Sequence, residues 1–174
     1  MMKKINYRWF YTSSKKLVIC GKNSDQNERL MKEIKPTDVI VHTSTPGSPF
    51  CIIKNPSSKD LKEVSIFCTC FSQQWKKKKK TAEVHIFRGN QVYKDKKMKK
   101  GTFGVLGKVQ KKKVPLVLYL KKQKGVLRAV PFVTKHRILP GRIPKEKVAE
   151  IIAEKLKVKK QEVLQAIPAG GFKL

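Results

Sequence analysis

Asp38 and His42 are the residues whose types and spacing come nearest to acid–base chemistry. A histidine oriented by a carboxylate can act as a general base. In a strand, however, residues four apart share a face at a separation of about 13 Å, so these two side chains do not meet directly. The chain also has only 12 acidic residues and lacks the G-x-S-x-G motif of serine hydrolases. We therefore expect no enzyme, with a nuclease or hydrolase on the Asp38 and His42 face as an alternative.

Neither the cysteines nor the glycines predict a metal or a cofactor. Cys20, Cys51, Cys68 and Cys70 form no C-x-x-C pair and have no histidine at ligand spacing, so we interpret them as buried thiols of a reducing compartment. Residues 101–107, GTFGVLG, lack the lysine of a P-loop and the helix that should follow. These glycines are expected to let a strand bend or another backbone approach.

The charge of the chain is high and unevenly distributed. The formal net charge is +29, and residues 76–145 hold 23 basic and 2 acidic side chains, against 7 and 6 in residues 21–75. Adaptation to heat would raise glutamate together with lysine, and that is not seen here. The excess predicts a one-sided basic face for a polyanionic partner, nucleic acid first, with a merely solvated lysine surface as the alternative.

No segment of the sequence is apolar over 18 residues, and the start, Met-Met-Lys-Lys, leads directly into an aromatic segment. Both features argue against a membrane span and a signal peptide. The sequence therefore predicts a soluble, cytoplasmic protein with no membrane partner and no small-molecule substrate.

The first elements are expected to be a hairpin over residues 6–20 and a helix that begins at Asn23 or Ser24 and ends before Pro36. The start of this helix offers free backbone amides together with Asn23, Gln26 and Asn27. Such groups can hold phosphate and sugar oxygens, or they can simply cap the helix. The sequence favours neither reading.

Strands are expected at residues 37–43 and 50–54, followed by a long helix capped at Ser57 or Ser58. The apolar stripe of this helix consists of Leu61, Val64, Cys68, Phe71 and Trp75. Trp75 is interpreted as a core residue, with stacking on a nucleic-acid base as the alternative.

The second half of the chain predicts strands at residues 81–87, 91–94, 102–108, 114–120 and 125–133, with lysine-rich connections. The last two should form an antiparallel hairpin. Two short helices follow, the first opened by Pro144. The predicted fold is α+β, with a mostly antiparallel sheet, two main helices and a small C-terminal helical extension. Residues 1–135 should form the principal domain, and residues 136–174 an extension too short to fold without docking onto it.

Five blocks in order carry a resemblance to a known family: GKNSDQNERL, PTDVIVHTSTPGSPFCIIKNP, FSQQW, NQVYK and GTFGVLGK. Over about residues 6–110 and the following hairpin, the sequence resembles the NFACT-R domain, the RNA-binding module of NFACT proteins in ribosome-associated quality control. The resemblance implies contact with tRNA or rRNA at the large ribosomal subunit. The N-terminal domain and coiled coil of full-length members have no counterpart in these 174 residues, so the resemblance is to a stand-alone form.

Two departures from the family pattern bear on the expected site. Lys22 stands where an arginine is usual, which keeps the charge and loses bidentate phosphate geometry. The segment from His42 to Gly47 lacks the family's acid and second histidine.

The expected RNA-binding residues combine positions of the family motif with the basic segments. They are Lys22, Asn23, Gln26, Asn27, Asp38, His42, Lys54, Asn55, Lys76, Lys77, Lys78, Lys79, Lys80, Lys94, Lys108, Lys111, Lys112 and Lys113. An alternative function is that of a structural ribosome-associated protein whose basic loops lie in rRNA.

Overall fold

The computed structural model describes residues 6–174, and its main sheet has six strands. Their order is β1 (Arg8–Tyr11), β2 (Leu17–Cys20), β4 (Cys51–Ile53), β3 (Val39–Thr43), β5 (Thr81–Arg88) and β8 (Gln110–Pro115). A second sheet has the order β10 (Val126–Val130), β9 (Leu118–Gln123), β11 (His136–Pro144) and β12 (Gly171–Lys173), and a short hairpin joins β6 (Val92–Tyr93) to β7 (Gly104–Val105). The Met-Met-Lys-Lys start, on which the signal-peptide expectation partly rested, lies outside the described residues.

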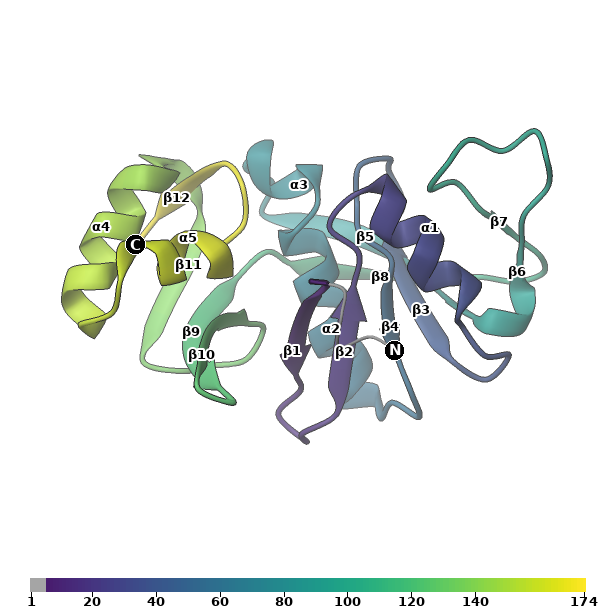
Figure 1. Cartoon of the computed structure of the whole chain (residues 1–174), viewed down its shortest axis with the longest axis horizontal. Coiled ribbons are helices and arrows are strands. Elements are labelled where there is room, and N and C mark those ends of the chain that lie inside the picture. Colours follow the sequence, from purple (N-terminus) through teal and green to yellow (C-terminus); the bar gives the residue numbers. More distant parts are fainter. Residues whose placement is uncertain (1–5) are drawn as a thin grey trace.

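The helices are α1 (Ser24–Lys32), α2 (Ser58–Cys70), α3 (Gln73–Lys76), α4 (Lys145–Leu156) and α5 (Lys160–Ala166), with a 3-10 turn, η2 (Gly89–Gln91). In Figure 1 the C-terminal helices α4 and α5 lie at one end of the molecule and the β6–β7 hairpin at the other, with the six-stranded sheet between them. All pairings that join the strands are antiparallel. The predicted α+β, mostly antiparallel fold is confirmed. Within residues 6–174, every helix is too short or too polar to cross a lipid bilayer.

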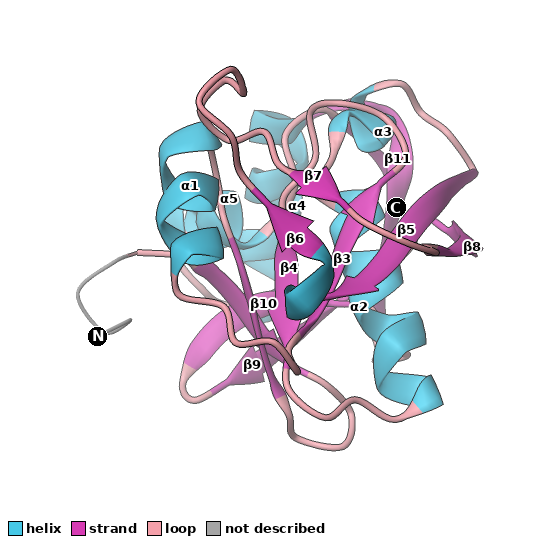
Figure 2. Ribbon diagram, turned by 90° about the vertical axis from the view of Figure 1, so that its right-hand side faces the viewer, coloured by secondary structure: helices cyan, strands magenta, loops and turns pink. Residues whose placement is uncertain are grey.

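The two main helices cover opposite faces of the six-stranded sheet, as Figure 2 shows for strands β3 and β4. Alternation along β3 explains this arrangement. Val39 and Val41 pack into the larger core, which includes the α2 residues Val64 and Phe67. Ile40 points the other way, into a smaller core with Met31 of α1. Because side chains alternate, His42 lies on the α1 side of the sheet.

The N-terminal hairpin forms as predicted, with Trp9 opposite Ile19 and Phe10 opposite Val18. Phe10 is completely buried and stacks on Phe67, whereas Trp9 is partly exposed. The aromatic run therefore divides between the core and the surface.

The long helix expected through Trp75 is wrong: the chain leaves the helix after Cys70 and starts α3 at Gln73. The break occurs at Ser72, whose hydroxyl accepts a hydrogen bond from the Gln74 amide (3.1 Å) and donates one to the Thr69 carbonyl (2.6 Å). A serine that bonds to nearby backbone competes with helix continuation. Trp75 is a core residue: it is fully buried, and its indole nitrogen donates to the carbonyl of Gly171 (2.9 Å).

Residues 110–115 form strand β8, where a lysine-rich connection was expected. Three consecutive lysines are tolerated there because β8 is an edge strand that pairs only with β5, and edge strands commonly carry lysine. The expected strand over residues 114–120 is instead divided between β8 and β9 at Pro115, whose missing amide cannot continue the ladder.

The C-terminal part of the chain is organised around β9. The predicted hairpin with β10 is present, and its turn places Lys124 and Gly125 at positive φ, as a tight primed turn requires. Residues 136–144, expected to lead directly into helices, first form β11, which also pairs with β9. The predicted domain boundary at residue 136 would therefore separate β11 from β9, although both strands belong to one sheet. The division into residues 1–135 and 136–174 stays a prediction.

Candidate functional site

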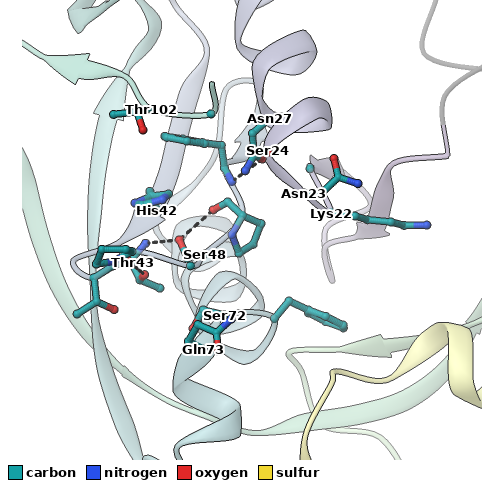
Figure 3. A pocket seen from close by; sticks show the side chains of 18 of the residues that line it. Lys22, Asn23, Ser24, Asn27, His42, Thr43, Ser48, Ser72, Gln73 and Thr102 are labelled. Atoms are coloured by element: carbon teal, nitrogen blue, oxygen red, sulfur yellow. Dashed lines mark hydrogen bonds between the residues drawn. The ribbon is translucent and has the colours of Figure 1, made fainter. Parts of the chain in front are cut away.

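A cavity of about 690 Å³ opens where four segments of the chain meet. Figure 3 shows side chains from the start of α1, the β3–β4 turn and the α2–α3 junction around it, with Thr102 from the loop before β7. These segments are distant in the sequence, so the fold, and not a local motif, creates the hollow.

The wall at α1 begins with a reciprocal cap. The side chain of Asn23 accepts from the Gln26 amide (2.9 Å), and the Gln26 side chain accepts from the Lys22 amide (2.9 Å). Both carboxamides thereby stabilise the first turn of α1, by reciprocal bonds from side chains to backbone amides like those of a capping box. Gln26 faces away from the cavity, and its side-chain nitrogen donates to the carbonyl of Asn6 (3.3 Å).

Asn27 ties α1 to the beginning of β4. Its side-chain oxygen accepts a hydrogen bond from the buried amide of Phe50 (3.2 Å). Gly21 leaves room for this contact, since a Cβ there would lie 2.1 Å from the same oxygen. A glycine at position 21 is therefore a packing requirement of the contact between Asn27 and Phe50.

The β3–β4 turn forms the opposite wall. Ser48 Oγ accepts from the Thr43 amide (3.0 Å) and donates to the Pro49 carbonyl (3.2 Å). Gly47, at φ +84°, accepts from the Gln73 amide (3.1 Å), and a Cβ at this position would lie 2.4 Å from the Gln73 side chain. The turn is thus joined to the start of α3.

His42 lies on the floor of the cavity, stacked on Phe50 with ring centroids 4.3 Å apart. Burial lowers the pKa of His42 to about 4, with backbone groups of Thr43 and Ser48 opposing the shift and the nearby His85 adding to it. The ring is consequently neutral at pH 7, so it supplies a hydrogen-bond donor and an acceptor but no positive charge.

The loop before β7 closes the cavity on the remaining side and is docked onto α1. Glu28 accepts from the Gly101 amide (2.8 Å) and from Lys94 Nζ (3.0 Å), and these contacts lower the pKa of the Glu28 carboxyl. Lys100 pairs with Asp25 at 2.8 Å. Lys94 also lies 4.7 Å from the centroid of the Phe103 ring, so it holds the loop in place.

Cations surround the opening. Lys22, Lys76, Lys100 and Arg8 all line it. The basic surface continues along β8, because Lys111 pairs with His85 and Lys113 with Glu83, and directly opposed residues of two strands point to the same face. His85 also pairs with His42, so this face is the cavity face.

The expected RNA-binding residues divide between the cavity and other places. Those that line the cavity are Lys22, Asn23, Asn27, His42 and Lys76. Asp38 is buried at the other end of β3, where it accepts from the Lys35 amide (2.9 Å) and from Lys54 Nζ (2.8 Å) beside a separate groove of about 240 Å³. Asp38 and His42 therefore do not share a site, and the structure does not bring together the pair that the hydrolase alternative needs.

The remaining expected residues lie in loops or on the edge strand. Asn55 is in a turn at φ 47°, where its carbonyl accepts from Lys16. Lys112 faces the α2 side of the sheet, opposite buried Val84. The last five of the expected residues are exposed and lie outside the cavity: Lys77, Lys78, Lys79, Lys80 and Lys108.

Several cavity residues were not expected from the sequence, among them Arg8, Gln73 and Thr102. No local pattern marks them, because each reaches the site through pairing or packing with a distant segment. Arg8 lies on the same face of β1 as buried Phe10, because side chains two apart in a strand share a face. Its place in the sequence therefore does not indicate a residue of the site.

In the described part of the chain, no three histidine, cysteine or acidic side chains are arranged to hold a metal ion. All four cysteines are buried free thiols, as predicted. Burial raises the pKa of Cys51 and of Cys70, which makes both poor nucleophiles.

Fold and cavity together define a small antiparallel α+β domain with a polar, cation-rimmed hollow beside a helix N-terminus. A family model described as the NFACT protein RNA binding domain matches residues 6–107. The chain therefore belongs to this family, and the resemblance noted in the sequence is confirmed.

The curated relatives are similar over part of the chain. It is 33% identical over 75 residues to the ribosome quality control complex subunit NEMF of Homo sapiens, and likewise to that of Mus musculus. Its identity to the Drosophila melanogaster homolog is 36% over 56 residues. The matches cover 40% and 32% of this chain but only 7% and 6% of those proteins.

A solved structure shares the fold. The C-terminal part of the fibronectin/fibrinogen-binding protein from Streptococcus suis superimposes with a TM-score of 0.58 over 63% of this chain and 46% of that one, at 16% identity. At this identity the likeness concerns the fold alone.

Proposed function

We propose that this protein binds RNA through the cavity between α1, the β3–β4 turn and the α2–α3 junction. The observation that carries the proposal is the composition of this site, which lies within the family match except for Ala169. Neutral hydrogen-bonding groups line its interior and cations line its rim. Neutral donors and acceptors suit sugar and base oxygens, while the cations suit phosphates.

The floor of the cavity supports binding of an unpaired nucleotide. A stacked His42–Phe50 pair with a neutral imidazole offers a flat surface and hydrogen-bonding groups. Single-stranded RNA is commonly held in this way, by stacking and base-edge contacts, with the backbone along a basic groove. The line of Lys111 and Lys113 on the same face gives the strand a path away from the cavity.

The partner we propose is tRNA or rRNA at the large ribosomal subunit, in ribosome quality control or translation in the cytoplasm. The names of the curated relatives support this choice. The chain spans only about 7% of their length, so the proposal concerns RNA contact and not the activity of a whole quality-control subunit.

The test is fluorescence anisotropy with labelled tRNA over a range of KCl concentrations. Log K falls linearly as log salt rises, and each phosphate contact makes this slope steeper by about 0.7–0.9. Relative to 1 M salt, one contact therefore raises the affinity at 0.1 M salt roughly five- to eightfold. Lys22→Glu removes one such contact and adds a repulsion, so it should weaken binding by more than that factor.

Lys59→Glu is the matched control, with the same change of charge on an exposed residue. Lys59 lies in the first turn of α2 and Phe71 of the cavity at its far end, about 18 Å away along the helix. This variant should keep nearly full affinity. Equal losses in the two variants would show that binding depends on net charge alone and would refute the cavity as the site.

Ribosome co-sedimentation separates a transient factor from a structural component. We expect the protein to leave the subunits in a high-salt wash. Retention through the wash would favour the structural ribosome-associated alternative.

A further inference from the structure

A second group of cations lies beside the cavity, at the seam between the two sheets. Arg8 comes from β1, Arg128 from β10, and Lys145 from the first position of α4. Strands β1 and β10 are in contact, and β1 lies next to the β9–β10 hairpin in Figure 1. We call Arg8, Arg128 and Lys145 the seam cations.

Hydrogen bonds join the two sheets at the seam. Gln123 at the end of β9 bridges to β1, with its oxygen accepting from the Tyr11 amide (2.8 Å) and its nitrogen donating to the Tyr11 carbonyl (2.8 Å). This pair of bonds imitates a strand ladder between the sheets. They connect the strand that carries Arg8 to the hairpin that carries Arg128.

Aromatic rings orient both guanidinium groups. Arg8 Cζ lies 4.1 Å from the centroid of the Phe71 ring, and Arg128 Cζ lies 4.8 Å from that of Trp9. Arg128 also donates from Nε to the Leu127 carbonyl (2.8 Å), which uses one of its five donors. Stacking of this kind fixes the plane of a guanidinium and leaves its edge available for two parallel bonds to phosphate oxygens.

The seam cations form no ion pair with the part of the chain that the structure describes. Within residues 6–174, no carboxylate oxygen lies within 4.0 Å of Arg8, Arg128 or Lys145. Burial and then the charge of Arg8 lower the pKa of Arg128 to about 10. The same two causes lower the pKa of Lys145, and the charge of Glu146 opposes them. Both guanidiniums stay charged at pH 7. Partly buried like charges without a partner destabilise a fold, and a bound anion would remove this penalty.

The seam adjoins the cavity, since the seam cation Arg8 is also a lining residue of the cavity. The C-terminal part of the chain reaches the cavity as well, through Ala169 in the loop before β12. Lys22, on the rim, is close enough that Arg8 and Arg128 both lower its pKa. Arg128 and Lys145 lie beyond the family match at residues 6–107. The C-terminal part of this chain thus adds cations to a site that begins in the family domain.

We propose that the seam cations bind a backbone phosphate of the same RNA strand that occupies the cavity. The proposal rests on the proposed function and adds to it a role for the C-terminal part of the chain. The guanidiniums of Arg8 and Arg128 donate hydrogen bonds to the phosphate oxygens, and Lys145 supplies further positive charge. An RNA that reaches both sites contacts the family domain and the extension together.

The experiment compares Arg128→Gln with Arg137→Gln by tRNA anisotropy against salt. Arg137 is exposed on β11, in the same sheet as β10. Arg137→Gln therefore removes the same charge as Arg128→Gln, but from a residue outside the seam. Arg128→Gln should reduce the salt slope by about 0.7–0.9 and the affinity at 0.1 M KCl about five- to eightfold. Arg137→Gln should leave both nearly unchanged, whereas equal effects in the two variants would overturn the proposal.

A second measurement does not depend on RNA. Pyrophosphate should raise the melting temperature of the unmodified protein more than KCl of equal ionic strength does, and Arg128→Gln should abolish that extra rise. An extra rise that persists in Arg128→Gln would also overturn the assignment. The variant should fold at least as stably as the parent without anion, since it relieves a like-charge contact.

The two proposals can fail separately. If Lys22→Glu weakens tRNA binding and Arg128→Gln does not, the cavity stands and the seam is refuted. If Lys22→Glu behaves like Lys59→Glu, while Arg128→Gln lowers affinity and abolishes the pyrophosphate effect, the cavity is refuted and the seam remains a phosphate site.

Discussion

Mild acid should destabilise this protein through a single side chain, His42. Its pKa is about 4 in the folded protein because the ring is buried, and about 6.5 in the unfolded chain. Between these values the unfolded chain binds more protons, so stability falls as the pH falls. Below pH 4 the difference in pKa lowers the free energy of unfolding by about 3 kcal/mol relative to neutral pH. At pH 5 the free energy of unfolding is already about 2 kcal/mol lower.

Urea unfolding followed by circular dichroism at pH 7 and pH 5 measures this loss. His42→Phe is the matched variant, because a phenyl ring can still stack on Phe50 and cannot be protonated. The free energy of unfolding of the parent should fall by about 2 kcal/mol more than that of His42→Phe. Buried carboxylates contribute little in this range, since the pKa of Asp60 is lowered in the fold and its loss comes only in stronger acid. A parallel decline of the two proteins would refute the account of His42 as a buried, neutral ring.

Two further substitutions test the contacts that shape the cavity and the seam. Gly21→Ala should displace the Asn27 side chain and leave the Phe50 amide unpaired, which costs about 1–3 kcal/mol in urea unfolding; a change below about 0.5 kcal/mol would contradict the packing described for this position. Gln123→Ala removes both bonds to the Tyr11 backbone, so hydrogen exchange of the Tyr11 amide should accelerate and stability should fall by about 1–3 kcal/mol. Unchanged exchange at Tyr11 would mean that the strands are held together in another way.

Local patterns predicted the elements whose neighbours along the chain determine them. The cap at Asn23, the N-terminal hairpin and the hairpin closed by Lys124 and Gly125 all follow from adjacent residues. Strand β8 was missed because lysines are weak strand formers, and only pairing with β5 makes a strand of this segment. The helix break depends on the two hydrogen bonds of the Ser72 hydroxyl, whereas the apolar stripe alone predicted a continuous helix.

In the site, too, residues placed by their neighbours along the chain could be predicted and those placed by distant segments could not. The polar start of α1 and His42 could be identified from the sequence, and the structure brings them to one cavity. Gln26 and Lys94 have side chains bonded to backbone groups of the protein itself, and their expected contact with RNA stays a prediction. Arg8 could not be identified, because its environment comes from Phe71 and from the C-terminal part of the chain.

The central claim is that RNA occupies the cavity, and photo-crosslinking tests it most directly. RNA containing 4-thiouridine would be bound to the protein, irradiated and digested, and the attached peptides would be identified by mass spectrometry. We predict crosslinks at residues 21–27, 42–50, 72–76 and 100–103, the segments that line the cavity. Crosslinks confined to lysine-rich segments outside the cavity, such as residues 77–80 and 121–124, with none in the cavity segments, would contradict it.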